Sequence, residues 1–271
     1  MGVTKKCEAG HRGRSAAGAA NGALARRAGE GKCYLVAMML EALRKAVLKA
    51  NLELVARGLV IDTFGNCSAI DREKGVVAIK PSGVAYDSMR PEDIVLTSLD
   101  GRIIEGTLRP SSDLPTHLVL YREFPHIGGV VHTHSSNATA WAQACREIPC
   151  LGTTHADYFR GAVPVTGHLL NEEIESEYEL NTGHAIVRRF ASLDPAHMPA
   201  VLVAGHAPFC WGSTVEEAVH VAVMLEQVAW LASSSLALNP SVQPLSEALR
   251  DKHFLRKHGP RAYYGLPVKG S

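Results

Sequence analysis

The chain has 271 residues, of which 46% are hydrophobic and 20% charged, and its formal net charge at pH 7 is +1. These values are typical of a globular chain with one large domain or two small ones. They exclude a disordered chain, a collagen and a protein that binds nucleic acid through bulk charge. Because no apolar run approaches the roughly 20 residues of a membrane-spanning helix, we also expect no membrane segment.

The N-terminal segment differs from the rest of the chain in charge and composition. Residues 1–38 hold seven Lys or Arg and two Glu, so they carry +5 and residues 39–271 carry −4. Ala and Gly dominate residues 1–32, which therefore have little to bury, and we predict a disordered or artefactual extension over residues 1–38. The Arg-rich, acid-poor composition also resembles an organellar transit peptide, and that alternative stays open.

From Leu40 onward the pattern predicts alternating helices and strands. The apolar positions 40, 43, 47, 48, 52 and 55 follow helical spacing, and Gly58 is suited to end that helix. Strands are predicted over residues 76–79, 94–98, 129–132 and 201–204. Helices are predicted over residues 115–124, 137–145, 214–238 and 245–258. No linker or internal repeat divides residues 39–265, so we predict one α/β domain followed by a loose tail, 266–271.

Cysteine usage indicates the compartment. The six cysteines are scattered without a CxxC pair or a regular spacing. In a chain of this length they are typical of reduced, mostly buried thiols, which favours a reducing compartment and hence the cytoplasm.

A pair of histidines two residues apart suggests a metal site. His132 and His134 lie at the end of the predicted strand 129–132, and side chains two apart on a strand point to the same face. His206 follows another apolar strand, and Asp113 stands at a predicted helix start. Three imidazoles and a carboxylate suit Zn²⁺ or a similar ion. The alternatives are polar histidines at strand ends and an Asp113 that only caps a helix.

Two turns and one helix start are suited to bind an anion. Residues 63–68 and 80–83 are rich in small, hydroxyl- and amide-bearing side chains and flank the predicted strand 76–79. Ser111 and Ser112 open a predicted helix, where free N–H groups and the helix dipole favour phosphate. Each segment taken alone is also compatible with an ordinary turn.

Sequence blocks along the chain identify a family. They are GNCS at 65–68, IKPSGV at 79–84, RPSSDLPTH at 109–117, GGVVHTHS at 128–135, GTTHADYF at 152–159, GHAPF at 205–209, DKHFLRKHG at 251–259 and AYYG at 262–265. In this order and spacing, residues 39–265 resemble the class II aldolase/epimerase superfamily, and within it the L-ribulose-5-phosphate 4-epimerase family. The resemblance implies a single class II aldolase-like α/β domain, with a central β-sheet flanked by helices.

The resemblance also implies a set of site residues. It implies that Zn²⁺, one ion per subunit, is bound by Asp113, His132, His134 and His206, although Mn²⁺ and Co²⁺ share such ligands. It implies substrate contacts by Gly65, Asn66, Lys80, Ser82, Gly83, Ser111, Ser112, Thr153, His253 and Arg256. Asp157 and Tyr264 match the two acid–base residues. Without the resemblance, Asp157 would be read as a turn carboxylate, Tyr264 as a packing residue and Lys80 as a solvated charge.

The activity implied is the interconversion of L-ribulose 5-phosphate and D-xylulose 5-phosphate, by cleaving and remaking the C3–C4 bond. The C4 hydrogen is not acidic, because the carbonyl lies at C2, so a retro-aldol step replaces simple deprotonation. The resemblance further implies a homotetramer with active sites between subunits. It names no single pathway, since arabinose and ascorbate catabolism both use this conversion, and it implies neither a nucleic-acid nor a membrane partner.

Two other functions stay open. One is a sugar-phosphate aldolase of the same superfamily, of the L-fuculose-1-phosphate type. The resemblance implies that aldolases of the superfamily carry Glu at the position of Asp113, whereas epimerases carry Asp there, as this chain does. The other is a non-catalytic module that resembles the adducin head, which would be expected to lack metal ligands, whereas all four matching positions are filled here.

Overall fold

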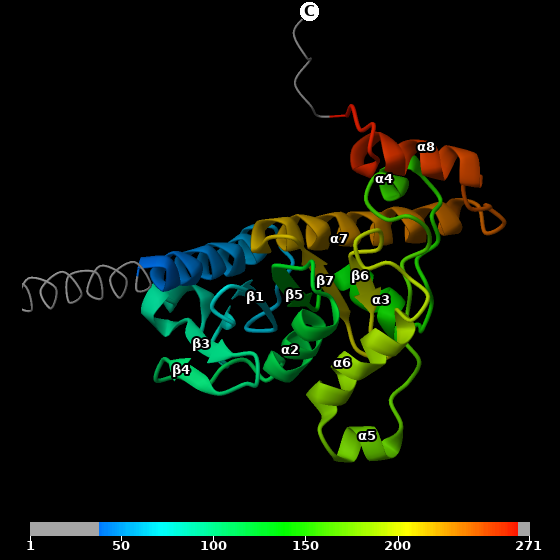
Figure 1. Ribbon diagram of the computed structural model, residues 1–271. Coiled ribbons are helices and arrows are strands. Elements are labelled where there is room, and N and C mark those ends of the chain that lie inside the picture. The colour runs from blue at the N-terminus through cyan, green and yellow to red at the C-terminus, as the bar shows by residue number, and fades with distance from the viewer. Residues whose placement is uncertain (1–37, 265–271) are drawn as a thin grey trace, which may run out of the picture. The chain divides into compact units, whose positions relative to one another are not determined.

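The computed structural model describes residues 38–264. The chain divides into two compact units, residues 1–42 and 43–271, and the second unit contains the sheet and the labelled helices (Figure 1). The predicted extension, apart from Met38, and the predicted tail 266–271 lie outside the described residues. Both therefore stay predictions.

The described part of the second unit is built around a seven-stranded sheet. Its strand order is β4-β3-β2-β1-β5-β7-β6, and all neighbouring strands are antiparallel. The strands are β1 Gly65–Asp71, β2 Val76–Ile79, β3 Val95–Ser98, β4 Ile103–Glu105, β5 Gly129–Thr133, β6 Ala200–Leu202 and β7 Pro208–Gly212.

Helices flank this sheet (Figure 1). The first described helix covers residues 38–56. The others are α2 Leu114–Glu123, α3 Ser136–Gln143, α4 Thr153–Ala156, α5 Asn171–Glu175, α6 Tyr178–Arg189, α7 Val215–Leu238 and α8 Glu247–His258, with short 3₁₀ turns at Tyr86–Ser88 and Pro91–Asp93. The α/β class and the central sheet flanked by helices are thus confirmed.

The long helix α7 supports the sheet. One face of it packs on β5 and β7, and the side chains of Val219, Leu225 and Ala229 are buried there. By length and composition α7 could cross a membrane, which the sequence analysis did not anticipate. In the structure one face of α7 packs on the sheet, and its Glu226 accepts hydrogen bonds from the N–H groups of Asn137 and Ala138.

A glycine at position 129 lets α7 approach the start of β5 closely. A Cβ built on Gly129 would lie 2.4 Å from the Cα of Val215, the first residue of α7. That distance is far shorter than any real contact, and backbone atoms cannot move aside as a flexible side chain can. Glycine is therefore required here by the close approach of the two backbones.

This contact leads to a stability prediction. We expect Gly129→Ala to lower the free energy of unfolding by about 3 kcal/mol, because the added methyl group must push β5 away from α7. Urea unfolding followed by circular dichroism measures the change. Gly167→Ala is the matched control, since a Cβ at Gly167 meets nothing within 4 Å. Equal unfolding midpoints for the two variants would contradict the packing described here.

The antiparallel sheet brings distant parts of the chain to one of its ends. Asn66 near the start of β1 pairs with His132 near the end of β5. The end of β2, which leads into Lys80, lies beside the start of β1. The turn between β6 and β7 carries His206 to the same end, because β6 runs parallel to β5. Four predicted site residues thus meet at one end of the sheet.

Candidate active site

Three histidine side chains face one another at this end of the sheet. The ring centroids of His132, His134 and His206 lie 4.9 to 5.0 Å apart in every pair. Each ring offers one nitrogen, and these nitrogens all lie within 4.8 Å of one another. His132 is buried and the other two are half-buried, so the cluster is open on one side. The sequence prediction that the HxH pair and His206 come together is confirmed.

The three imidazoles have unprotonated ring nitrogens that can bind a cation. The carbonyl of Pro208 lies 2.9 Å from Nδ1 of His132 and can only accept, so this nitrogen carries the proton and Nε2 is left as the ligand atom. Burial, reinforced by the neighbouring His132 and His134, lowers the pKa of His206 to about 4. Burial and His132 likewise lower the pKa of His134. At neutral pH these two rings are uncharged and can accept a cation.

Asp113 lies next to this cluster without joining it. Its carboxylate accepts a hydrogen bond at Oδ2 from Asn66 Nδ2 over 2.7 Å. Burial alone would raise the pKa of Asp113, but His132, His117 and the Asn66 amide hold it below its ordinary value. Asp113 is therefore an anion beside the three imidazoles. Its role as a metal ligand stays a prediction.

The donor set fits a divalent metal ion. Three imidazole nitrogens around one point, with an open side, match the arrangement of catalytic zinc sites, in which the protein supplies three ligands. A buried amide oxygen, Asn66 Oδ1, has no hydrogen-bond partner among the described residues. A site with an anion, neutral imidazoles and a free acceptor is suited to a cation and a polar ligand.

Lys80 lies buried next to the predicted anion turns. It is 2% exposed, and its ammonium donates to the Pro81 carbonyl over 3.4 Å, with no carboxylate partner among the described residues. It lies 4.6 Å from the ring centroid of Tyr86, and burial lowers its pKa. Backbone hydrogen bonds join the turn that holds Lys80 to residues 109–111. The Ser82 N–H donates to the Arg109 carbonyl, and the Ser111 N–H donates to the Lys80 carbonyl. A buried cation without a counter-ion is well suited to an anionic substrate group.

The remaining predicted anion residues surround this turn. Ser111 is buried, while Ser82, Gly83 and Ser112 are exposed. The sequence interpretation of residues 63–68 as a turn was wrong, because Gly65, Asn66 and Ser68 belong to strand β1. Their small and polar side chains indicate a turn, but here they are buried in a strand that runs beside the site.

A second group of predicted residues surrounds Asp157. Arg256 donates through Nε to Oδ1 over 3.1 Å and through Nη2 to Oδ2 over 2.8 Å. His253 Nδ1 lies 3.1 Å from the same Oδ1. Burial alone would raise the pKa of Asp157, but the bonds from Arg256 and His253 lower it. The exposed Tyr264 lies with its ring centroid 4.6 Å from the Arg256 guanidinium. We refer to these four residues as the Asp157 cluster.

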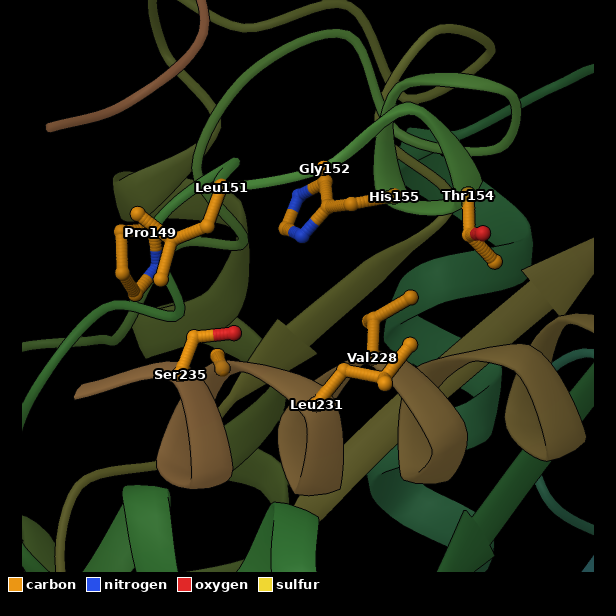
Figure 2. A pocket seen from close by; sticks show the side chains of 9 residues that line it. Pro149, Leu151, Gly152, Thr154, His155, Val228, Leu231 and Ser235 are labelled. Atoms are coloured by element: carbon orange, nitrogen blue, oxygen red, sulfur yellow. The ribbon is translucent and has the colours of Figure 1, made fainter. Parts of the chain in front are cut away.

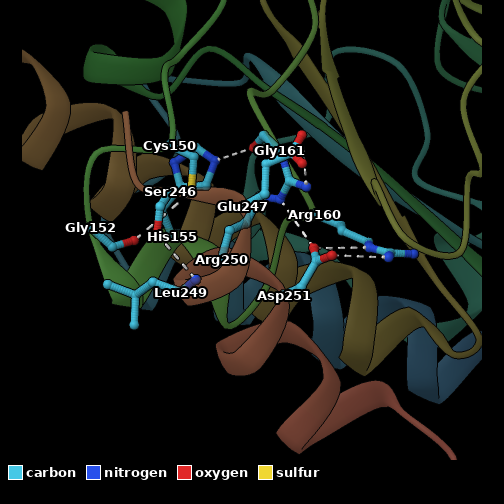
Figure 3. A network of polar contacts seen from close by, with 10 residues as sticks. All are labelled: Cys150, Gly152, His155, Arg160, Gly161, Ser246, Glu247, Leu249, Arg250 and Asp251. Atoms are coloured by element: carbon cyan, nitrogen blue, oxygen red, sulfur yellow. Dashed lines mark hydrogen bonds and ion pairs between the residues drawn. The ribbon is translucent and has the colours of Figure 1, made fainter. Parts of the chain in front are cut away.

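Polar contacts attach α8 to the segment that carries Asp157 (Figure 3). Arg160 pairs with Asp251 over 3.4 Å, and the Leu245 N–H donates to the Cys150 carbonyl over 2.9 Å. His155 is buried and donates from Nε2 to the Gly161 carbonyl over 2.7 Å. These contacts fix the turn after α4 against α8 and so hold the Asp157 cluster together.

The histidine cluster and the Asp157 cluster do not contact each other within the described part of the polypeptide. Among residues 38–264, no hydrogen bond, ion pair or ring contact links them. Figure 1 shows α4 and α8 on the side of α7 that faces away from the sheet. Thr153, the first residue of α4, lies on that side too.

Cavities in the described part of the chain lie outside the histidine cluster. One, of about 130 Å³, separates residues 149–155 from α7, and Figure 2 shows His155 lying above Val228 and Leu231. A second, of about 610 Å³, is lined by Tyr158 and His258 together with Ile127 and Ser213. Ile127 precedes β5 and Ser213 follows β7, so this cavity lies at the opposite end of the sheet from the histidines.

Two residues that the sequence analysis did not identify hold metal-ligand candidates in place. The hydroxyl of Tyr178 lies 3.3 Å from His206 Nδ1. Glu226 on α7 accepts hydrogen bonds from the N–H groups of Asn137 and Ala138, at the start of the helix that follows His134. Tyr178 opens a helix that was not predicted, and Glu226 carries no local signal, since its partners are far away in sequence.

Comparisons with known proteins identify the family of this chain. Residues 45–232 match the model of the class II aldolase and adducin N-terminal domain family. The chain belongs to this family. An L-ribulose-5-phosphate 4-epimerase UlaF of Salmonella paratyphi B is 53% identical over 226 residues, which are 83% of this chain and 99% of that protein. A protein of the same name from Salmonella typhi shows the same identity and coverage.

Solved structures of family members confirm the fold. An L-fuculose 1-phosphate aldolase aligns with a TM-score of 0.67 at 24% identity, over 78% of this chain and 94% of that one. YgbL of Klebsiella pneumoniae, described as a putative aldolase/epimerase/decarboxylase, aligns with a TM-score of 0.63 at 24% identity, over 79% and 98%. The predicted class II aldolase-like fold is therefore correct.

Proposed function

We propose that the protein is an L-ribulose-5-phosphate 4-epimerase, an isomerase that interconverts L-ribulose 5-phosphate and D-xylulose 5-phosphate. The observation that carries the proposal is a three-imidazole cluster beside Asp113, in a chain 53% identical to proteins of that name along nearly their whole length. The aldolase alternative is supported only by more distant relatives at 24% identity, which share the fold. A non-catalytic module would have no use for the cluster.

We propose that the bound ion is Zn²⁺, held by His132, His134 and His206 with Asp113 as the fourth ligand. A divalent ion at this position would act as a Lewis acid on the substrate oxygens. The support is the donor set itself, in which three imidazoles face a common point and the anionic Asp113 carboxylate lies beside them. Nitrogen-rich sets of this kind suit zinc among the common biological metals.

Inversion at C4 proceeds through cleavage of the C3–C4 bond, because the C4 hydrogen is not acidic enough for direct deprotonation. A base removes the proton from the C4 hydroxyl, the C3–C4 electron pair passes to the fragment that holds the C2 carbonyl, and glycolaldehyde phosphate is released within the site. The aldehyde then turns to present its other face. Re-formation of the bond, with a proton returned to the C4 oxygen, gives the inverted centre.

The residues near Lys80 have the properties needed to retain the aldehyde fragment. Lys80 is a buried cation without a counter-ion, and Asn66 offers a buried oxygen without a partner. We assign substrate and phosphate contacts to these two residues and to Gly65, Ser82, Gly83, Ser111, Ser112, Thr153, His253 and Arg256. Holding the fragment at fixed distance makes its re-addition effectively intramolecular.

We assign the two proton transfers to Asp157 and Tyr264, one for each epimer. The Asp157 carboxylate is anionic and can accept a proton, and the hydrogen bonds from Arg256 and from His253, 3.1 Å away, fix its orientation. Because the Asp157 cluster lies apart from the histidines, we propose a homotetramer in which each site combines two subunits. Trp230, half-exposed on α7, is available for such a contact.

We further propose that the enzyme acts in carbohydrate metabolism in the cytoplasm, on small sugar phosphates alone. The four cysteines in the described part of the chain, Cys67, Cys145, Cys150 and Cys210, are all free thiols, as a reducing compartment requires. No feature of the described site is adapted to a nucleic acid or a membrane. This agrees with the near-neutral net charge of the chain.

A product assay separates the epimerase from the aldolase. We expect the zinc-loaded protein to convert L-ribulose 5-phosphate into D-xylulose 5-phosphate, detected with a coupling enzyme specific for the latter. An aldehyde-trapping reagent in a parallel sample should capture almost no glycolaldehyde phosphate, because the fragment is kept within the site. Accumulation of trapped aldehyde without xylulose 5-phosphate would instead identify an aldolase.

A further inference from the structure

Behind the histidine cluster, a buried chain of hydrogen bonds joins β1 to α2. Ser68 Oγ lies 2.7 Å from His117 Nδ1 and 2.8 Å from the Tyr121 hydroxyl. All three side chains are buried, with exposures of 0 to 1%. None of them has a role in the function proposed above. A wholly buried polar chain costs free energy unless its groups are satisfied, so its presence requires a reason.

Counting donors sets the direction of this chain. Ser68 Oγ is the one side-chain partner of the Tyr121 hydroxyl among the described residues, so the tyrosine proton is satisfied only if it points to Ser68. The serine proton then points to His117 Nδ1, which must be unprotonated. His117 is therefore neutral with its proton on Nε2. The opposite direction would leave the tyrosine proton and the Nε2 lone pair both unpaired, which is costlier.

The Nε2 atom of His117 is left without a partner next to the proposed metal centre. It is buried and forms no hydrogen bond within the described residues. Asp113 lies one helical turn before His117 on α2, and it is a charged neighbour of the ring, as His132 would be if protonated. The ring also packs edge-on against Phe209, on which His132 stacks at 4.2 Å. The imidazole thus lies between the hydroxyl chain and the metal-ligand candidates.

Two parallel side-chain pairs connect β1 with α2 at this point. Asn66 and Ser68 lie two apart on β1 and share a face, and Asp113 and His117 lie one turn apart on α2. Asn66 bonds to Asp113, and Ser68 bonds to His117. The strand that presents Asn66 to the site is therefore locked in register against the helix that presents Asp113.

We propose that Tyr121, Ser68 and His117 form a positioning chain for the metal centre. The two hydroxyls fix His117 as the Nε2–H tautomer, and the imidazole supports the Phe209 ring on which the ligand candidate His132 stacks. The inference rests on the proposed metal site, and its test does not depend on the proposed activity.

Zinc affinity measures the effect of breaking this chain. In the full-length protein, Zn²⁺ binding is measured by competition with a chromogenic chelator. We expect Ser68→Ala and Tyr121→Phe to weaken binding by about tenfold, as loss of an outer partner of a metal ligand does. Ser233→Ala is the matched control, because it removes a hydroxyl that pairs with Trp141 Nε1 over 2.9 Å away from the histidines. Affinities equal to that of the control would overturn the proposal.

The tautomer of His117 provides a second test that needs only the folded protein. In long-range ¹H–¹⁵N spectra of the zinc-free chain, the His117 ring, identified by its absence in His117→Gln, should show the proton on Nε2. Tyr121→Phe should shift the ring toward a mixture of tautomers. A proton on Nδ1 in the unaltered protein would overturn the proposal. If zinc affinity and tautomer behave as expected but no epimerisation occurs, only the proposed function has failed.

Discussion

His132→Ala should abolish epimerisation and remove the bound zinc while leaving the protein folded. The expected loss of turnover is about 10³-fold or more, because a Lewis acid contributes several kcal/mol to the stabilisation of developing charge. His132 is the most buried of the three imidazoles, and its Nδ1 is fixed by the Pro208 carbonyl. No neighbouring side chain can replace its Nε2. Metal content by elemental analysis and turnover by the coupled assay measure the two effects.

The control for this variant is His184→Ala, which removes an exposed imidazole on α6. We expect that protein to keep its zinc and its turnover. Circular dichroism should show that both variants are folded. Retained activity of His132→Ala in a metal-free preparation would show that the histidine cluster is not the Lewis-acid site.

Asp157→Asn should reduce turnover by roughly 10²–10⁴-fold without changing the zinc content, because it removes a proton-transfer group that is remote from the histidines. The asparagine amide still accepts a hydrogen bond from Arg256, so α8 should remain attached. Steady-state kinetics and elemental analysis of the purified variant test both statements. Asp100→Asn, at an exposed turn, is the matched control and should keep its turnover. Loss of zinc in Asp157→Asn would show that the two clusters are coupled within one chain.

Mixing the two inactive proteins should restore activity. If each site takes its histidines from one subunit and Asp157 from the next, co-expression of His132→Ala with Asp157→Asn creates some sites with both halves intact. For random mixing in a closed ring, about one quarter of the sites should be intact. Activity that stays at the level of the single variants would mean that each chain builds its site alone.

The fold could be predicted where hydrophobic pattern and structure agree. Strand β2 and helix α7 were found within one residue at each end, because one is a short apolar run and the other a long one with turn residues at both ends. Strand β1 was missed because Asn66 and Ser68 are polar, although both are buried. Helix α6 was missed as well, since its segment begins among charged residues that obscure the apolar face. Local pattern thus fails where the chain holds site residues.

In the site, too, local spacing predicted some features, while others depend on tertiary contacts. The HxH spacing predicted that His132 and His134 point the same way, and the rings lie 5.0 Å apart. That Lys80 is buried, or that Asp157 is bonded by Arg256, depends on contacts across the fold that no local spacing encodes. The separation of the two clusters by α7 is likewise a property of the tertiary structure. The roles of Asp157 and Tyr264 could be proposed only through the family resemblance.

The central claim is that this chain inverts C4 of a ketopentose 5-phosphate, and one measurement tests it most directly. Zinc-loaded, full-length protein is incubated in separate samples with L-ribulose 5-phosphate and with D-xylulose 5-phosphate, and both samples are followed by ¹³C NMR. The account predicts that the two samples converge on the same mixture of the two sugars, with no other product. Failure of either sugar to form from the other would contradict it.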